Sequence, residues 1–240
     1  MRKIFFTLTL ITIPILSIFA SGDKETNFGG QIDVYAEYSP IEEVTISLGE
    51  EVSFTNFLAT ENGVFDATNT VLGVTYTPHP NITIEAGYEF LYSNAEIMEH
   101  CVKLSAIPQV ELGDFSLSLQ ETAQMTYSMF EKSYNWQIVS NLEVAYAIPN
   151  TPLSAYIYTE MTNLLGTLFP SVISTSTGSG TSTSSVTEPV QNTPWYDEFC
   201  HRAGLDWSID EINTLGIYYE FSHTIDSYSH LIGIGYTASF

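Results

Sequence analysis

The chain has 240 residues, of which 44% are hydrophobic and 14% are charged, with 28 Asp and Glu against 6 Lys and Arg. Globular proteins carry about 25% charged residues, so this composition excludes a disordered acidic tail and supplies a large apolar surface. The net charge of −22 excludes nucleic-acid binding, which needs clustered cations against the phosphates. Beyond the first twenty positions no apolar run reaches the roughly 18 residues that a membrane-spanning helix needs.

Residues 1–22 have the pattern of a signal peptide. Arg2 and Lys3 give a positive start, a charge-free apolar stretch follows, and small residues near position 20 suit a cleavage site. A retained N-terminal anchor is the alternative, but the stretch is short for a membrane span and contains Pro14. We therefore expect export and a single mature domain over 23–240. Its cations are Lys24, Lys103, Lys132 and Arg202.

The mature sequence alternates apolar and polar residues with a period of two, which is typical of β-strands. The clearest case is 81–93, where six apolar side chains alternate with Thr, Glu and Gly. The same pattern predicts ten strands, most of them near the length with which a tilted strand crosses a bilayer. They are 44–54, 69–77, 81–92, 100–111, 115–127, 135–147, 153–163, 199–208, 212–222 and 228–240, and an eleventh candidate, 31–38, precedes them.

Short connections rich in turn residues alternate with longer loops at 55–68, 93–99, 128–134, 164–198 and 223–227. Short periplasmic turns and long extracellular loops are typical of outer-membrane barrels. The Ser/Thr/Gly tract within 164–198 indicates a flexible extracellular loop. A linker between two domains would look similar, but the strand pattern resumes at once on both sides.

The polar face of each strand carries Ser, Thr, Gly, Gln and isolated Glu, whereas the surface of a soluble sandwich would be rich in charges. The 15 Tyr and 14 Phe fit aromatic girdles at the membrane interfaces. The sequence therefore predicts an all-β fold, a transmembrane antiparallel up-and-down β-barrel of ten to twelve strands. Segment 31–38 conflicts with the rule that even-stranded barrels keep both termini in the periplasm. We expect it at the rim or in the lumen, unless a further strand exists.

The C-terminal strand ends in Phe240, with Tyr236 on the same face. This pattern resembles the signal read by the outer-membrane barrel assembly machinery. It predicts a bacterial outer-membrane location, with that machinery and the outer-membrane lipid as partners.

The polar faces, directed inward, predict a charged lumen in which acids outnumber cations. Such a lumen favours cations, while an internal salt-bridge network that fills a closed barrel is the alternative. Glu50 and Glu121 fall on the lipid face, and we expect a β-bulge to reset the alternation there. The predicted lumen-lining residues are Glu51, Glu85, Glu89, Lys103, Glu143, Glu160, Arg202, Asp206 and Glu220.

Cys101 and Cys200 occupy matching places, each just after a long loop. A disulfide between them is a candidate in an oxidising compartment, although their strands are four apart and a bridge needs Cα atoms within about 7 Å. A metal site with the neighbouring His100 and His201 is disfavoured because adjacent strand residues face opposite ways. We predict no metal and no cofactor.

Three function classes remain open from the sequence. The first is a small-solute or cation-preferring pore, or a structural barrel. The second is a surface adhesion or recognition protein that acts through the 164–198 loop. The third is an outer-membrane hydrolase, for which Ser222-His223 with Asp226, or His230 near Ser227 and Ser229, are the only clusters. Because such residues are ordinary in a polar loop, we predict no enzyme.

The order of motifs resembles an uncharacterised family of bacterial outer-membrane barrels, domain of unknown function 2490. The resemblance covers most of the mature chain and implies the fold and the location, with no established activity. The motifs that carry it are Gln31–Tyr38, Glu50-Glu51, Gly87-Tyr88, Arg202 to Trp207 with Gly204-Leu205, and His230-Leu231 with Gly233.

Overall fold

The computed structural model describes residues 25–240 except 56–63, 94–97, 131, 165–197 and 225–226, so the predicted signal peptide and most of the 164–198 loop lie outside the described residues. No helix in the described part is long and apolar enough to span a membrane. The described residues form eleven strands: β1 (Glu25–Ile41), β2 (Val44–Thr55), β3 (Val64–His79), β4 (Ile82–Ser93), β5 (Met98–Leu112), β6 (Phe115–Ser128), β7 (Ser133–Ala147), β8 (Leu153–Leu164), β9 (Glu198–Ser208), β10 (Asn213–Thr224) and β11 (Ser227–Ser239).

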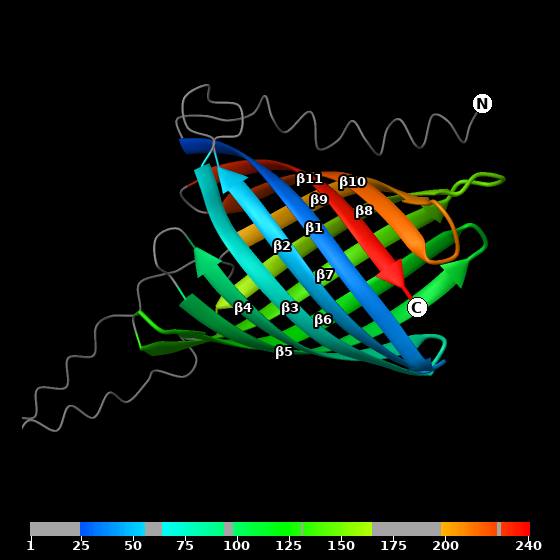
Figure 1. Cartoon of the computed structure of the whole chain (residues 1–240), viewed down its shortest axis with the longest axis horizontal. Coiled ribbons are helices and arrows are strands. Elements are labelled where there is room, and N and C mark those ends of the chain that lie inside the picture. Colours follow the sequence, from blue (N-terminus) through cyan, green and yellow to red (C-terminus); the bar gives the residue numbers. More distant parts are fainter. Residues whose placement is uncertain (1–24, 56–63, 94–97, 131, 165–197, 225–226) are drawn as a thin grey trace, which may run out of the picture.

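The strands form one closed barrel in which each strand pairs antiparallel with the next along the chain (Figure 1). The circle is completed by β1 and β11, which lie side by side and pair in parallel, from Glu25 opposite Ser227 to Glu37 opposite Ser239. The fold prediction and the strand count are thus confirmed, and the parallel closing pair is a feature that the sequence did not predict.

Segment 31–38 lies inside β1, in the barrel wall, where it pairs with both β2 and β11. The expectation that it occupies the rim or the lumen is therefore wrong, and so is the even-strand rule from which it came. A parallel closing pair allows an odd number of strands, and β1 then begins at the same end of the barrel as the long loops. Among the strand bounds the largest changes are in β1, which begins at Glu25 rather than at 31, and in β3, which begins at Val64 rather than at 69.

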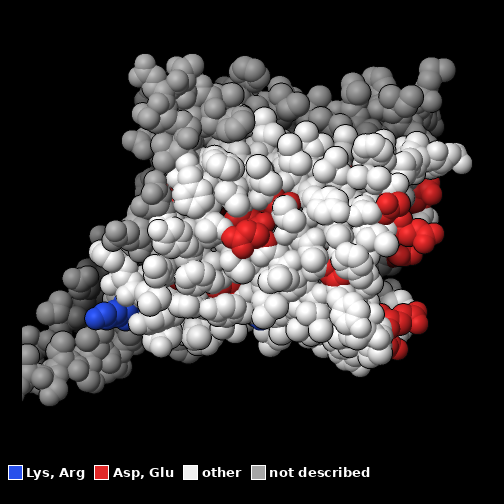
Figure 2. All heavy atoms as spheres, in the orientation of Figure 1, with Lys and Arg blue, Asp and Glu red and all other residues white. Residues whose placement is uncertain are grey.

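The outer wall is apolar because every second residue of each strand points away from the barrel. Leu48, Leu104 and Ile217 are each more than half exposed there. Figure 2 shows a wall that is mostly uncharged, with acidic side chains gathered at the turn end on the right and an acidic cluster in the middle of the view. Water would oppose so wide an apolar surface, whereas lipid accepts it. The barrel therefore spans a membrane, and barrels of this kind belong to the bacterial outer membrane.

The interior of the barrel is lined by polar side chains and not by an apolar core. Its most buried side chains include Asp33, Ser105, Thr122 and Asn141. Small side chains and glycines leave room for the long ones that project inward from neighbouring strands. The interior is consequently organised by hydrogen bonds, and these define the candidate site.

Candidate functional site: the polar lumen

At the loop end of the lumen, Lys103 on β5 pairs with Glu89 on β4, with 2.5 Å between Nζ and Oε1. The pair borders a pocket of about 310 Å³ between β3 and β7. Cys101, two residues before Lys103 on the same face, also lines it. Both charges are only partly exposed, so they neutralise one another in a confined space.

The second ion pair of the lumen joins Arg202 on β9 to Glu220 on β10. Both Nε and Nη2 of Arg202 donate to Oε2 of Glu220, over 2.9 and 2.6 Å. The guanidinium also lies 4.3 Å from the ring centroid of Tyr218 and 5.7 Å from that of Tyr158. Arg202 is thus held by a carboxylate and two aromatic faces, an arrangement that its planar delocalised charge favours.

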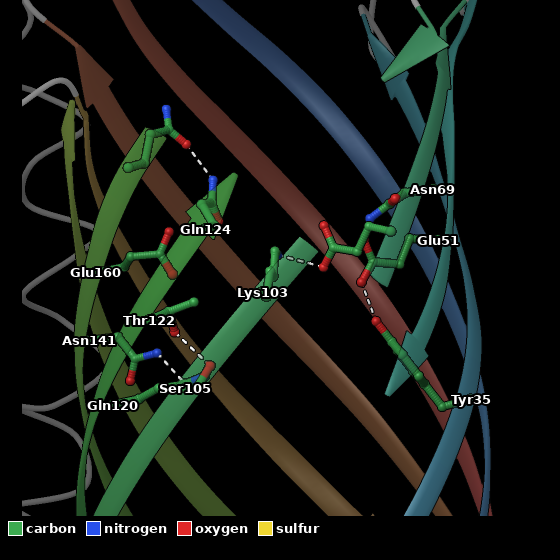
Figure 3. A network of polar contacts seen from close by, with 12 residues as sticks. Tyr35, Glu51, Asn69, Lys103, Ser105, Gln120, Thr122, Gln124, Asn141 and Glu160 are labelled. Carbon is green, nitrogen blue, oxygen red and sulfur yellow. Dashed lines mark hydrogen bonds and ion pairs between the residues drawn. The ribbon is translucent and has the colours of Figure 1, made fainter. Parts of the chain in front are cut away.

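Three tyrosines of the lumen donate hydrogen bonds to carboxylates. Tyr35 donates to Glu51, and Tyr158 donates to Glu160. Tyr218 donates to Asp33 over 2.8 Å, and these bonds stabilise the acids without neutralising their charge. Figure 3 shows Tyr35 and Glu51 joined in this way, next to Asn69, whose Nδ2 donates to Glu51 over 3.1 Å.

The lumenal tyrosine rings lie directly against glycines of the neighbouring strand. A Cβ atom at Gly49 would lie within 2.2 Å of the Tyr35 ring, and one at Gly204 within 2.5 Å of the Tyr156 ring. Each glycine is the direct cross-strand partner of its tyrosine. The absence of a side chain at these positions is what lets the rings lie flat along the inner wall.

A hydroxyl and amide ladder crosses β5, β6 and β7 (Figure 3). Ser105 and Thr122 share a hydrogen bond of 2.8 Å, and Gln120 Nε2 donates to Ser105 Oγ over 3.0 Å. Asn141 Nδ2 then donates to Gln120 Oε1 over 2.9 Å. This neutral ladder separates the two ion pairs around the wall.

The inner surface carries more negative than positive charge. Within the described residues, Glu89 and Glu220 are the lumenal acids that form ion pairs with Lys or Arg. Asp33 was not among the lumen-lining residues predicted from sequence, because segment 31–38 was not placed in the barrel wall. Its alternation with Gln31 and Tyr35 was the signal that could have identified it as inward-facing. The inward acids without such an ion pair in that part of the chain include Asp33, Glu51, Glu85, Glu99, Glu143, Glu160 and Asp206.

Sequence reasoning also missed the lumenal tyrosines, since Tyr was assigned to the lipid girdles. Tyr156, Tyr158 and Tyr218 share their strand face with the inward acids Glu160 and Glu220. Strand parity was therefore the signal that distinguishes them from outward tyrosines.

Glu50 and Glu121 lie on the outer face at mid-strand, where the pairing on both sides keeps the same register. The β-bulge predicted for these positions is wrong. Neighbouring hydroxyl groups instead supply hydrogen bonds to these two outward carboxylates. Thr68 and Thr70 donate to Glu50, the second over 2.8 Å, and Ser140 donates to Glu121 over 2.7 Å.

The candidate disulfide is absent, and Cys101 and Cys200 are both buried free thiols. Cys101 belongs to β5 and Cys200 to β9, and β6, β7 and β8 lie between them in the wall. Four strand spacings of about 4.8 Å each exceed the reach of a disulfide. The matching places of Cys101 and Cys200 in the sequence correspond to equivalent positions on two different strands. They do not indicate a contact between the two cysteines.

The hydrolase clusters do not assemble in the described residues. Ser222 faces the lumen, whereas His223 and His230 lie on the outer face, and His230 Nδ1 bonds the hydroxyl of Tyr219 over 2.6 Å. Asp226 lies outside the described residues. His201 and His223 stack with Phe199 and Phe221 on the same outer face, as expected for an interfacial girdle.

The last strand is anchored at the turn end. Phe240 N donates to Glu37 O over 2.9 Å, and Ser39 N donates to Phe240 O over 3.0 Å. The Phe240 ring is exposed, and Tyr236 Oη donates to Asn213 Oδ1 over 2.5 Å. Recognition of Tyr236 and Phe240 by the assembly machinery stays a prediction.

No family model and no curated protein matches the chain. Among solved structures it is similar to a bacterial polysaccharide outer-membrane secretin, at 9% identity over 79% of this chain and 62% of that one, with a TM-score of 0.46. It is also similar to a KdgM porin in complex with disordered oligogalacturonate, at 10% identity over 84% and 92% of the two chains, with a TM-score of 0.45. This chain thus spans less than two thirds of the secretin. At such scores, the fold assignment rests on the strand pairing of this chain itself.

Proposed function

We propose that this outer-membrane barrel is a passage for small solutes that favours cations. The observation that carries the proposal is the charge of the inner wall. Inward carboxylates such as Glu51, Glu143 and Asp206 have no ion pair with Lys or Arg among the described residues, whereas Lys103 and Arg202 are each paired with a glutamate. The lumen therefore retains a net negative charge after its cations are counted.

Fixed charges of one sign in a narrow passage with low-dielectric walls concentrate counter-ions. The polar inner wall suits water, and barrels of eight strands are filled by side chains while those of 16–18 strands hold a channel. Eleven strands lie between these cases. The pocket at the loop end supports an entrance wide enough for a small solute.

The placement of the cations favours selection nearer the turn end. Lys103 and Arg202 lie in the loop-side halves of β5 and β9, and both are neutralised there. Asp206 follows Arg202 by four residues on the same strand face, which is roughly 13 Å toward the turns. Glu143 lies in the turn-side half of β7, so an entering cation would meet Asp206 and Glu143 after it has passed the two ion pairs.

The test is the reversal potential of the purified barrel in planar bilayers under a salt gradient. Replacing Glu143 and Glu160 with Gln should reduce the cation preference, because both carboxylates face the lumen. Glu121→Gln is the matched control, since the same change on the outer wall should leave the preference unaltered. Anion preference, or no conductance from folded protein, would reject the proposal in favour of a filled structural barrel.

A second variant uses the opposite sign of charge. Arg202→Gln should raise the cation preference, although it leaves Glu220 without its partner and can weaken the barrel. The double variant Arg202→Gln with Glu220→Gln removes one charge of each sign. It should therefore return the preference to that of the unmodified protein, and a preference that stays raised would contradict the electrostatic explanation.

The lumen disfavours acidic oligosaccharides such as the oligogalacturonate bound by the neighbour porin, because its free charges are negative. Adhesion through the 164–198 loop remains an alternative that deletion of 171–187 tests, since a pore would keep its conductance. We propose no enzymatic activity, because Ser222 faces the lumen whereas His223 and His230 face outward.

A further inference from the structure

The pocket at the loop end of the lumen has features that general ion passage does not require. It has a volume of about 310 Å³ and is formed by side chains from five consecutive strands, β3 to β7. This volume is at the lower end of the range for small-molecule sites. The side chains that carry the argument are Asn69, Glu89, Lys103, Gln124 and Gln137, with Leu91 beside them.

We propose that this pocket is a binding site for a small neutral solute rich in hydroxyl groups, of the size of one monosaccharide. The inference rests on the proposed function, because it identifies a solute class that the passage would collect at its outer entrance. The inference adds a specific binding step to the proposed passage, and a simple ion pore lacks such a step.

Hydrogen-bond donors and acceptors are mixed around the pocket. Gln124 Nε2 donates to Gln137 Oε1, so the pair also presents a carbonyl oxygen and an amino group. Lys103 and Glu89 lie next to one another and offer further donors and acceptors at 2.5 Å separation. A hydroxyl both donates and accepts, so a polyol is the ligand that satisfies neighbouring groups of both kinds.

The pocket wall also contains an unsatisfied acceptor. Asn69 Nδ2 donates to Glu51, which fixes the orientation of the amide, while Oδ1 is buried without a hydrogen-bond partner. A buried acceptor without a partner costs about 1–3 kcal/mol. A ligand hydroxyl that reaches this wall of the pocket would remove that cost, and Figure 3 shows Asn69 next to Glu51.

The lining of the pocket disfavours apolar and anionic ligands. Leu91 is the single aliphatic side chain of the lining, so an apolar ligand would find little to contact. An anion would meet Glu89 and Glu99, and Lys103 is already neutralised by Glu89. The charged side chains of the lining, Glu89, Glu99 and Lys103, sum to a formal charge of −1, which disfavours an anion, while the donors and acceptors of the amides suit a neutral ligand.

The test is saturation-transfer NMR on the folded barrel in detergent, with D-glucose as the neutral probe and with D-glucuronate and protonated D-glucosamine as the charged ones. D-Glucose should bind saturably and D-glucuronate should not. Asn69→Leu and, separately, Gln124→Leu should weaken glucose binding by about tenfold, the effect of one lost buried hydrogen bond. Asn163→Leu, the same substitution on the outer face of β8, should leave binding within about twofold of the unmodified protein.

Retained resistance of the barrel to unfolding by SDS at room temperature identifies the variants that fold. Binding of D-glucosamine alone would overturn the inference in favour of a cation site, and equal weakening by Asn163→Leu would show that the pocket is not the place of binding. Conductance without glucose binding would reject this inference alone. Glucose binding without conductance would reject the passage and leave the binding site standing.

Discussion

The hydroxyl of Tyr218 donates a hydrogen bond of 2.8 Å to the carboxylate of Asp33, although 185 residues separate them in the chain. Tyr218 belongs to β10 and Asp33 to β1, so the bond reaches past β11, where Gly233 is the cross-strand partner of Tyr218. The parallel pairing of β1 with β11 is less stable per residue than an antiparallel pairing. This side-chain bond therefore reinforces the seam at which the barrel closes.

Tyr218→Phe should lower the free energy of unfolding by about 1–3 kcal/mol, because Asp33 loses a buried donor. Hydrogen exchange of the β1 and β11 amides should become faster. The control is Tyr219→Phe, which loses a bond to His230 on the outer face that does not reach β1. Equal exchange at the seam in both variants would show that the bond to Asp33 does not reinforce it.

Gly233 and Gly235 lie two residues apart on the same inner face of β11 and provide a matched pair. A Cβ atom at Gly233 would lie 2.0 Å from the Tyr218 ring, whereas one at Gly235 would meet only the Asp33 Cβ at 4.0 Å. Gly233→Ala should destabilise the barrel by about 1–3 kcal/mol through overpacking. Gly235→Ala should be close to neutral in urea unfolding, and an equal loss in both would contradict the packing explanation.

Glu50 and Glu51 are adjacent in sequence and should respond in opposite directions to the same substitution. Glu50→Leu should raise the free energy of unfolding in lipid by about 1 kcal/mol, because it removes a carboxylate from the lipid face. Glu51→Leu should lower it, because Tyr35 and Asn69 each lose their acceptor. Folding titrations in vesicles measure both, and changes of the same sign would refute the assigned faces.

The two thiols provide a direct chemical check of the strand order. Alkylation of the denatured, unreduced protein should label both Cys101 and Cys200, since both are free and three strands lie between theirs. Intact mass measured before and after reduction should be identical. A protein that takes no label until it is reduced would indicate a disulfide and a different arrangement of β5 and β9.

Asp210, in the turn between β9 and β10, should contribute a pH-dependent part of the stability. The side chain of Asn213 and the backbone amides of Ile212 and Asn213 donate to its carboxylate and lower its pKa from the usual value of 3.8. The contribution is present above about pH 4 and is lost as the pH falls through the lowered pKa of the folded state. Between about pH 2 and 6, the free energy of unfolding should rise with pH in the unmodified protein and in Glu211→Gln. The rise should be smaller in Asp210→Asn.

The strands could be predicted from the sequence because their signal is local. Alternation in segments such as 82–93 is set by whether each side chain meets lipid or lumen, and the turn residues Gly113 and Asn150 adopt positive φ where the chain reverses. For the same reason the inward direction of Glu85, Glu143 and Arg202 followed from parity. Parity failed to identify Asp33 because its segment had been kept out of the wall by a rule on strand number.

What the sequence by itself determined is therefore the barrel, its two faces and the excess of acid on the inner one, because each depends on residues one or two positions apart. The closing pair of β1 and β11, the pairing of Arg202 with Glu220, the separation of Cys101 from Cys200 and the pocket beside Lys103 were decided only by the tertiary structure. These features depend on which strands become neighbours around the circle and in which register. Ring closure fixes both at once, by satisfying the backbone hydrogen bonds of the first and last strands against one another.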